Sequence, residues 1–353
     1  MRINFLTPHL RIAGGVRILL MYASLLAQRG HEVRIYVRST NSFRRTVANL
    51  FQIGGPTWIQ DLYGAQVIRV GGFSEDTLCD ADILISTTFD NTLQVENLPE
   101  EKGKKVYLLQ HDEGLYHGDR EKADKAYCSG SKKIVVSSWL KEVLRERAHT
   151  DGILLLNPID HNQFYEIPGL RRASGEIRVL LLAHTYDWKG TREGVEIVNR
   201  LKKQYPNIRL DLFGVRQKDS GEISCDTYTF NPPQDKLRDI YSRADIYLCP
   251  SWDEGFGLPS VEAMKCGAAL VTYDNGGSRD FAFHEDTALV AKRRNVQDLE
   301  RQLERAITDD KLRMSIAKKG QQFVRDMPGW DTRTIEFESI LENILHPTKQ
   351  TSK

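Results

Sequence analysis

The sequence has few cysteines, no long hydrophobic run and almost no net charge. Its five cysteines are odd in number, scattered and never in a Cys-x-x-Cys pair. This excludes a disulfide framework or a cysteine zinc site and favours reduced thiols in a cytoplasmic protein. No run of about eighteen apolar residues exists, so we expect no membrane span. A formal charge of +1 argues against bulk binding of nucleic acid.

The small net charge hides a basic amino-terminal region. Residues 1–70 contain nine arginines and no lysine against two acidic residues, a net charge of +7. This region is either a surface for an anionic acceptor or lipid headgroups, which implies peripheral contact at the inner face of a membrane, or a set of dispersed, solvated arginines. The first ten residues lack the charged start and apolar core of a signal peptide. For the irregular residues 41–64 we expect a loop with short helices over an acceptor cleft.

Strand and helix patterns alternate along the chain in two series. The first begins with a strand over Arg2–Leu6, a helix over Val16–Arg29 and a strand over Glu32–Val37, which predict a parallel βαβ unit. The first series ends with a strand pattern over Ile153–Leu156. After a polar stretch at 160–176, the second begins with a strand at Arg178–Leu182 and includes a helix over Gln234–Arg243. Because 353 residues exceed one average core, we predict two successive doubly wound α/β domains, with ligands at the carboxyl ends of their strands.

Gly14-Gly15, at the start of the first helix, lacks the Gly-x-Gly-x-x-Gly spacing of dinucleotide-binding proteins. The most informative stretch lies later, from Ser251 to Met264. It contains Glu254-Gly255-Phe256-Gly257-Leu258-Pro259 and ends in a helix pattern over Val261–Lys265 that carries Glu262. Glycines allow a ligand to approach the backbone, helix N–H groups bind phosphate oxygens, and carboxylates accept from sugar hydroxyls. This pattern favours a hydroxyl-rich, phosphate-bearing ligand over a plain strand–loop–helix corner whose glutamates only favour the helix start.

The same stretch resembles the Glu-x7-Glu signature of retaining nucleotide-sugar glycosyltransferases, family 4 (group 1), which have two facing Rossmann-like domains in the GT-B architecture. Further matches cover nearly the whole chain: Gly14-Gly15, Arg29–Val33, Asn157–Asp160, Trp188–Gly190, Tyr241–Asp245, Pro250-Ser251 and Gly276-Gly277. The resemblance implies an amino-terminal acceptor domain over 1–165 and a nucleotide-sugar domain over 166–329. It also implies that a final helix over 330–346 crosses back to the first domain.

The implied activity is a retaining transfer of a hexose-type sugar from a nucleotide-diphosphate sugar, with UDP-sugars favoured. The implied acceptor is a glycan or lipid-linked glycan in polysaccharide biosynthesis. In such enzymes the leaving phosphate itself takes the acceptor's proton, so no protein base is required. We expect metal independence and no cofactor beyond the donor substrate.

The resemblance also assigns roles to single residues. Lys189 would stabilise the leaving diphosphate, whose charge grows in the transition state, and His111 would bond the sugar and orient the site. Glu254 would hold the transferred sugar and Glu262 the ribose hydroxyls. The catalytic set is therefore His111, Lys189 and Glu254. The donor-binding set is Gly15, His184, Lys189, Arg216, Phe230, Glu254, Gly255, Phe256, Gly257, Leu258 and Glu262.

One position departs from the family pattern. His184 stands where the family has an arginine, five residues before Lys189. Histidine offers no permanent charge, so either the diphosphate is held more weakly or another cation substitutes. Arg216 is the first candidate for that cation and Arg192 the second. The loop that starts at Phe230 would lie against the base.

Two alternatives remain open at this point. Residues 274–277, Asp-Asn-Gly-Gly, either line the donor pocket or form a type I′ hairpin turn. For the whole chain, the alternatives to a transferase are a catalytically weak sugar-nucleotide-binding partner of another transferase and a GT-B sugar-nucleotide epimerase.

Overall fold

The computed structural model describes residues 1–347 apart from 12, 40–45, 48, 50–55, 57–60, 117, 172–174 and 216–223. The chain divides into two compact units, Met1–Asn157 with Asp331–Lys353, and Pro158–Trp330. The passage from the first unit to the second falls at Asn157, several residues before the expected boundary at 165.

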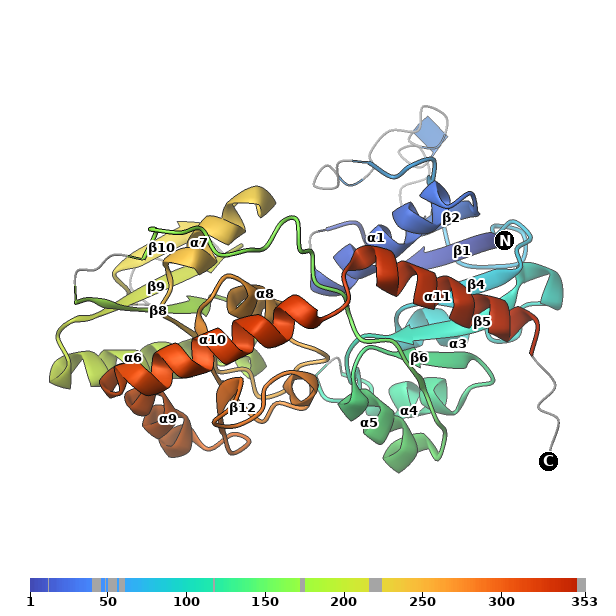
Figure 1. Cartoon of the computed structure of the whole chain (residues 1–353). Coiled ribbons are helices and arrows are strands. Elements are labelled where there is room, and N and C mark those ends of the chain that lie inside the picture. The colour runs from blue at the N-terminus through green and yellow to red at the C-terminus, as the bar shows by residue number, and fades with distance from the viewer. Residues whose placement is uncertain are drawn as a thin grey trace, which may run out of the picture. The chain divides into compact units, whose positions relative to one another are not determined.

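The first unit is a parallel sheet of strand order β3-β2-β1-β4-β5-β6-β7 with helices packed against it (Figure 1). Its central strands are almost wholly buried, as in a sheet covered on both faces. Its elements are β1 (Arg2–Thr7), α1 (Gly14–Gln28), β2 (Glu32–Arg38), β3 (Gln66–Val70), β4 (Ile83–Ser86), α3 (Phe89–Val95), β5 (Lys104–Leu109), α4 (Arg120–Cys128), β6 (Lys132–Val135), α5 (Ser138–Ala148), β7 (Ile153–Leu154) and α11 (Trp330–Leu345).

The second unit repeats this plan with the parallel order β10-β9-β8-β11-β12-β13. One core cluster joins β8, β9, β11 and β12 to α6 and α9. The elements are β8 (Ile177–Leu182), α6 (Thr191–Gln204), β9 (Ile208–Gly214), β10 (Thr227–Phe230), α7 (Leu237–Arg243), β11 (Ile246–Cys249), α8 (Leu258–Lys265), β12 (Ala269–Tyr273), β13 (Ala288–Ala291), α9 (Val296–Thr308) and α10 (Asp310–Asp326).

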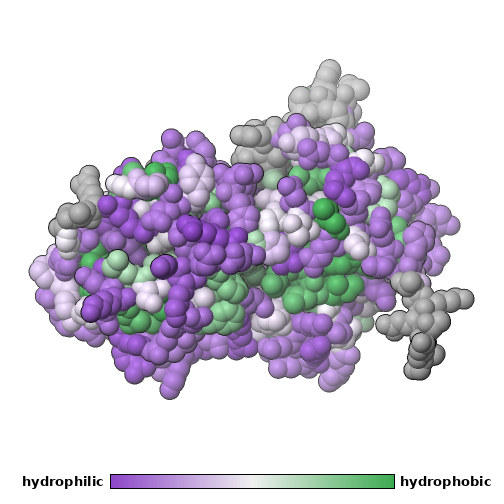
Figure 2. All heavy atoms as spheres, in the orientation of Figure 1, coloured by the Kyte–Doolittle hydropathy of each residue, from purple (hydrophilic) through white to green (hydrophobic). Residues whose placement is uncertain are grey.

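Each sheet changes the direction of its strand order once, between β1 and β4 in the first unit and between β8 and β11 in the second. Ligands of doubly wound sheets bind beyond the carboxyl ends of the strands at this switch point. The two predicted doubly wound domains are thereby confirmed. Hydrophilic residues cover most of the face drawn in Figure 2, with smaller groups of hydrophobic residues among them.

Helix α11 packs on the first unit, although the sequence places it last. The ring of Phe337 lies 4.7 Å from that of Tyr22 on α1, and the carboxylate of Glu338 accepts from Arg29 and meets His31, each at 2.6 Å. The chain thus returns to the first unit, as the sequence analysis predicts.

Some local expectations differ from the structure. A helix over Gln234–Arg243 is expected, but its start is a separate 3-10 turn, Gln234–Lys236, before α7. The strand expected at Ile153–Leu156 pairs over two residues only, in β7. Most of the stretch 41–64 lies outside the described residues.

Candidate functional site

The turn between β11 and α8 is built by glycine geometry. All of β11 is buried, and α8 starts at Leu258, three residues before the first helical residue expected from the sequence. Gly257 precedes the helix with φ +103, a left-handed conformation that side-chain-bearing residues rarely adopt. Phe256 is 3% exposed and packs edge-on against Phe281, so its side chain anchors the turn in the core.

The loop after β12 supports this turn from the side. Backbone hydrogen bonds join Glu254 N–H to the Asn275 carbonyl at 2.9 Å and Gly277 N–H to the Glu254 carbonyl at 3.0 Å. A Cβ on Gly277 would lie 2.6 Å from backbone atoms of Glu254, Gly255 and Phe256. Because β12 and β13 run parallel, the hairpin interpretation of residues 274–277 is wrong. These residues pack against the turn instead.

Lys189 and Glu254 meet across the switch point of the second sheet. Lys189 ends the short 3-10 helix Asp187–Lys189 after β8, and Glu254 follows β11. The lysine Nζ donates to Glu254 Oε1 at 2.7 Å, and both line a cavity of about 40 Å³ with Ser251 and Ser260. The Trp252 N–H donates to the Trp188 carbonyl at 2.8 Å, which holds the two loops together.

Gly190 explains why the loop carrying Lys189 can lie so close to β11. Its φ is +64, and a Cβ there would collide with the carbonyl oxygen of Pro250. Only glycine satisfies both demands.

His184 does not replace the family's arginine as a cation. It is partly buried; burial, with a smaller contribution from Lys189, lowers its pKa to about 4 despite the opposing effect of Glu254. Its Nδ1 accepts from the Tyr186 N–H at 3.1 Å. At neutral pH the ring is therefore an uncharged acceptor beside the Lys189–Glu254 pair.

Only one of the two cations proposed as a substitute is among the described residues. Arg216 lies outside the described residues. Arg192 is exposed and lines a different hollow at the start of α6.

The remaining donor-side residues lie on α8 and at the end of β10. Glu262 is 6% exposed, and its Oε2 accepts from Tyr241 O–H at 3.0 Å. Phe230, the last residue of β10, is 52% exposed at the carboxyl edge of the sheet. Tyr241 lies in the stretch matched to the family, but its bond to Glu262 was not anticipated.

In the first unit, the structure joins Gly15 to the segment that carries His111. The Gln110 side chain donates to the Gly15 carbonyl at 3.0 Å, and a Cβ on Gly15 would lie 3.3 Å from the Gln110 amide. His111 follows directly, after β5, and its ring stacks on Tyr116 at 6.3 Å. Both predicted residues therefore lie at the carboxyl end of the first sheet.

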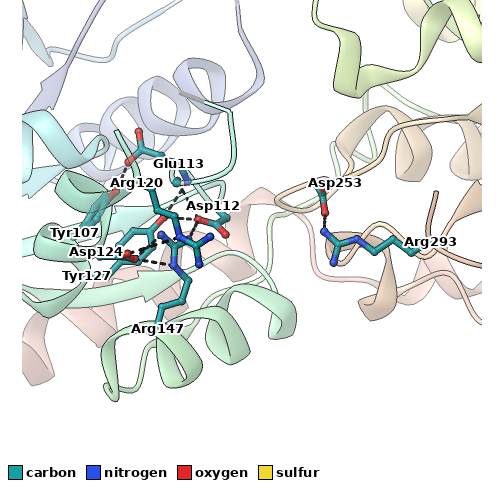
Figure 3. A network of polar contacts seen from close by, with 10 residues as sticks. Tyr107, Asp112, Glu113, Arg120, Asp124, Tyr127, Arg147, Asp253 and Arg293 are labelled. Carbon is teal, nitrogen blue, oxygen red and sulfur yellow. Dashed lines mark hydrogen bonds and ion pairs between the residues drawn. The ribbon is translucent and has the colours of Figure 1, made fainter. Parts of the chain in front are cut away.

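A network that the sequence analysis missed fixes the turn after His111 (Figure 3). Asp112 is 3% exposed and accepts from Arg147 and, at 3.0 Å, from Tyr127 O–H. Glu113 accepts from Tyr107 O–H and, at 2.7 Å, from the Phe89 N–H, and burial raises its pKa to about 7. Two adjacent acids three residues after the end of β5 were the available signal.

A second network lies beside Glu254. Asp253 is 1% exposed and accepts from Arg293, as Figure 3 draws, and the guanidinium of Arg294 lies 4.2 Å from the Trp252 ring centroid. The loop after β13 thereby holds the residues that precede Glu254.

Among the described residues, no group of three or more His, Cys, Asp or Glu side chains could hold a metal ion. In the same part of the chain, no helix has the length and hydropathy needed to cross a membrane.

Residues 166–323 match the family model described as Glycosyl transferases group 1. A Campylobacter jejuni protein, N,N'-diacetylbacillosaminyl-diphospho-undecaprenol alpha-1,3-N-acetylgalactosaminyltransferase, is 28% identical over 149 residues, 41% of this chain and 39% of the relative. The chain spans less than two thirds of the length of the curated relatives it matches, from 39% to 61% for three of them.

Solved structures match over nearly the full length. Sucrose-phosphate synthase from Thermosynechococcus elongatus superposes with a TM-score of 0.81 at 16% identity, covering 98% of this chain and 100% of that one. Anabaena HepE in complex with UDP-glucose gives 0.75 at 16% identity, covering 97% and 100%. Residues 166–323 therefore resemble the group 1 glycosyltransferases, and the chain has the GT-B fold of two parallel-sheet Rossmann-like domains.

Proposed function

We propose that this protein is a retaining, metal-independent glycosyltransferase that moves a hexose-type sugar from a nucleotide-diphosphate sugar, preferably a UDP-sugar, to a glycan or lipid-linked glycan acceptor. The observation that carries the proposal is the Lys189–Glu254 pair at the switch point of the unit that matches the family. The HepE structure with UDP-glucose and the lipid-linked substrate in the Campylobacter relative's name support the donor and acceptor classes.

The chemistry follows from charge. Cleavage of the sugar–phosphate bond transfers negative charge to the leaving diphosphate, and a fixed ammonium beside it stabilises the transition state more than the ground state. Glu254 carries a negative charge and repels that diphosphate, so its carboxylate accepts from hydroxyls of the transferred sugar. Lys189 then binds the phosphate, while Glu254 holds the lysine ammonium in position.

Glu262 binds the ribose hydroxyls through its carboxylate, which the Tyr241 O–H orients. Phe230 presents an aromatic face to the base. Retention requires no protein base in this scheme, because the leaving phosphate accepts the acceptor's proton.

The test is release of nucleoside diphosphate across a panel of UDP- and GDP-sugars, with and without a chelator, with the product's anomeric configuration read by NMR. Retained configuration and rates unchanged by chelator are expected. An inverted product or a strict manganese requirement would contradict the mechanism.

The neutral state of His184 favours a second candidate function, a sugar-nucleotide-binding partner of another transferase with weak activity. The diphosphate site then lacks the positive charge that an arginine at this position would supply. Tight nucleotide binding with negligible turnover on every donor and acceptor in the panel identifies that case.

A further inference from the structure

A second, larger hollow lies in the carboxyl-terminal unit beside the Lys189–Glu254 cavity. Its volume is about 410 Å³, within the usual range of ligand pockets. The loop after β8 and the first turns of α6 line it, together with Trp252 and Val296. Gly190 and Trp252 of this hollow directly follow Lys189 and Ser251, which line that cavity, so the two cavities adjoin.

The ring of Tyr186 forms an ordered aromatic surface in this hollow. Tyr186 is 47% exposed although it is a large aromatic residue. Its ring stacks on Trp188 with centroids 4.2 Å apart and planes 14° from parallel, and the Tyr186 N–H is fixed by His184. Such a ring offers a rigid contact face at little cost in conformational entropy, and the C–H face of a sugar ring fits against it.

The polar groups of the hollow suit hydroxyls rather than phosphates. Its ionisable lining consists of Asp187, Glu193 and Glu196 against Arg192, with His184 neutral at pH 7. The excess of carboxylates repels a diphosphate, whereas each carboxylate accepts from neighbouring hydroxyls of a sugar. Glu193 is oriented for this by the Tyr273 O–H, which donates to it at 2.7 Å. The hollow therefore differs in charge from a site built around Lys189.

We propose that this hollow, between Tyr186 and Trp252, is a saccharide-binding subsite that takes an uncharged sugar ring of the acceptor glycan. The assignment to an acceptor rests on the proposed function, but binding of the saccharide does not. Acceptor contacts would then come from this surface of the carboxyl-terminal unit as well as from the basic amino-terminal region.

The direct test uses the protein without any donor on an array of short neutral oligosaccharides of hexose and N-acetylhexosamine, with uronic-acid oligosaccharides on the same array. The strongest neutral ligand is then titrated by calorimetry. We expect the wild type to bind neutral glycans in preference to acidic ones, and Tyr186→Ala to weaken that binding by about tenfold or more. Tyr186→Phe keeps the ring and should retain most of the affinity.

Met314→Ala is the matched control, since it truncates an exposed apolar side chain on α10 and should leave glycan binding unchanged. UDP affinity, measured in parallel, shows whether Tyr186→Ala has disturbed the neighbouring loop. Absence of neutral-glycan binding by the wild type, or binding that Tyr186→Ala leaves intact, overturns the subsite. Glycan binding without transferase activity upholds the subsite and overturns the proposed function, so the two failures are distinguishable.

Discussion

The Nζ of Lys189 lies 2.7 Å from Oε1 of Glu254, although 65 positions of sequence separate the two residues. Their side chains are only 21% and 14% exposed, so water screens this pair less than it screens a surface ion pair. The carboxylate positions the ammonium before any substrate arrives. Binding of an anion therefore requires little reorganisation of the lysine.

Removing this cation should reduce turnover more than donor binding. We expect Lys189→Ala to lower kcat by about 10²- to 10³-fold, the usual effect of losing one group that stabilises transition-state charge. Lys189→Arg should restore part of the rate. The rate of nucleoside diphosphate release measures the activity of both variants. Lys318→Ala, an exposed lysine on α10, is the control and should be silent. A wild-type kcat in Lys189→Ala would remove the residue from the mechanism.

The glycines that bring the loops together should tolerate no side chain. Gly277→Ala places a Cβ 2.6 Å from the Glu254 backbone, and Gly190→Ala adds a clash with Pro250 to a left-handed backbone. Each should lower the free energy of unfolding by about 2 kcal/mol or more, as urea titration measures. A Cβ at Gly130 has no atom within 4 Å, so Gly130→Ala should change the free energy of unfolding little. Equal effects in all three variants would contradict the close packing.

Glu113 should make stability fall as pH rises. Burial raises the pKa of its carboxyl from 4.5 to about 7, so the folded state favours the protonated form. The stabilisation that Glu113 contributes is greatest below pH 4.5, where its carboxyl is protonated in both the folded and the unfolded state. It is lost as pH rises through about 7. The advantage of wild type over Glu113→Gln should shrink by roughly 3 kcal/mol between about pH 4.5 and 8. If the free energies of unfolding of wild type and Glu113→Gln change in parallel with pH, the raised pKa of Glu113 is refuted.

His184 should behave as a neutral side chain in donor binding. With its pKa lowered to about 4 by burial and by Lys189, it stays uncharged from about pH 5.5 to 8. His184→Gln should therefore leave the pH dependence of UDP affinity unchanged over that range. His184→Arg adds a permanent charge beside the site and should tighten UDP binding by about tenfold, measured by calorimetry. A histidine-dependent loss of affinity near pH 6.5 would contradict this prediction.

The sequence predicts the sheets and the turn between β11 and α8 because both depend on local patterns. Buried parallel strands read as continuous apolar runs, and a turn that needs left-handed backbone reads as glycine. The start of α8 was placed too late because Leu258 and Pro259 look like loop residues, although proline suits a first helical turn.

The parts that could not be predicted depend on tertiary contacts. Asp112 and Arg147 lie 35 positions apart, in the turn after β5 and on α5, and no spacing rule links them. Arg192 was a candidate for the diphosphate because it follows Lys189 closely, but helix rotation places it in the wall of the neighbouring hollow. The charge state of His184 depends on burial, which its neighbours in sequence do not reveal.

The return of α11 to the first unit sets the order in which the protein matures on the ribosome. Residues 158–330 form a complete unit that can close as soon as they emerge. The amino-terminal unit, although synthesised first, lacks Phe337 and Glu338 until translation reaches them, and leaves the surface around Tyr22 and His31 uncovered. Synthesis from one end thus completes the second unit before the first, and a nascent chain that ends before residue 331 leaves the face of α1 around Tyr22 exposed.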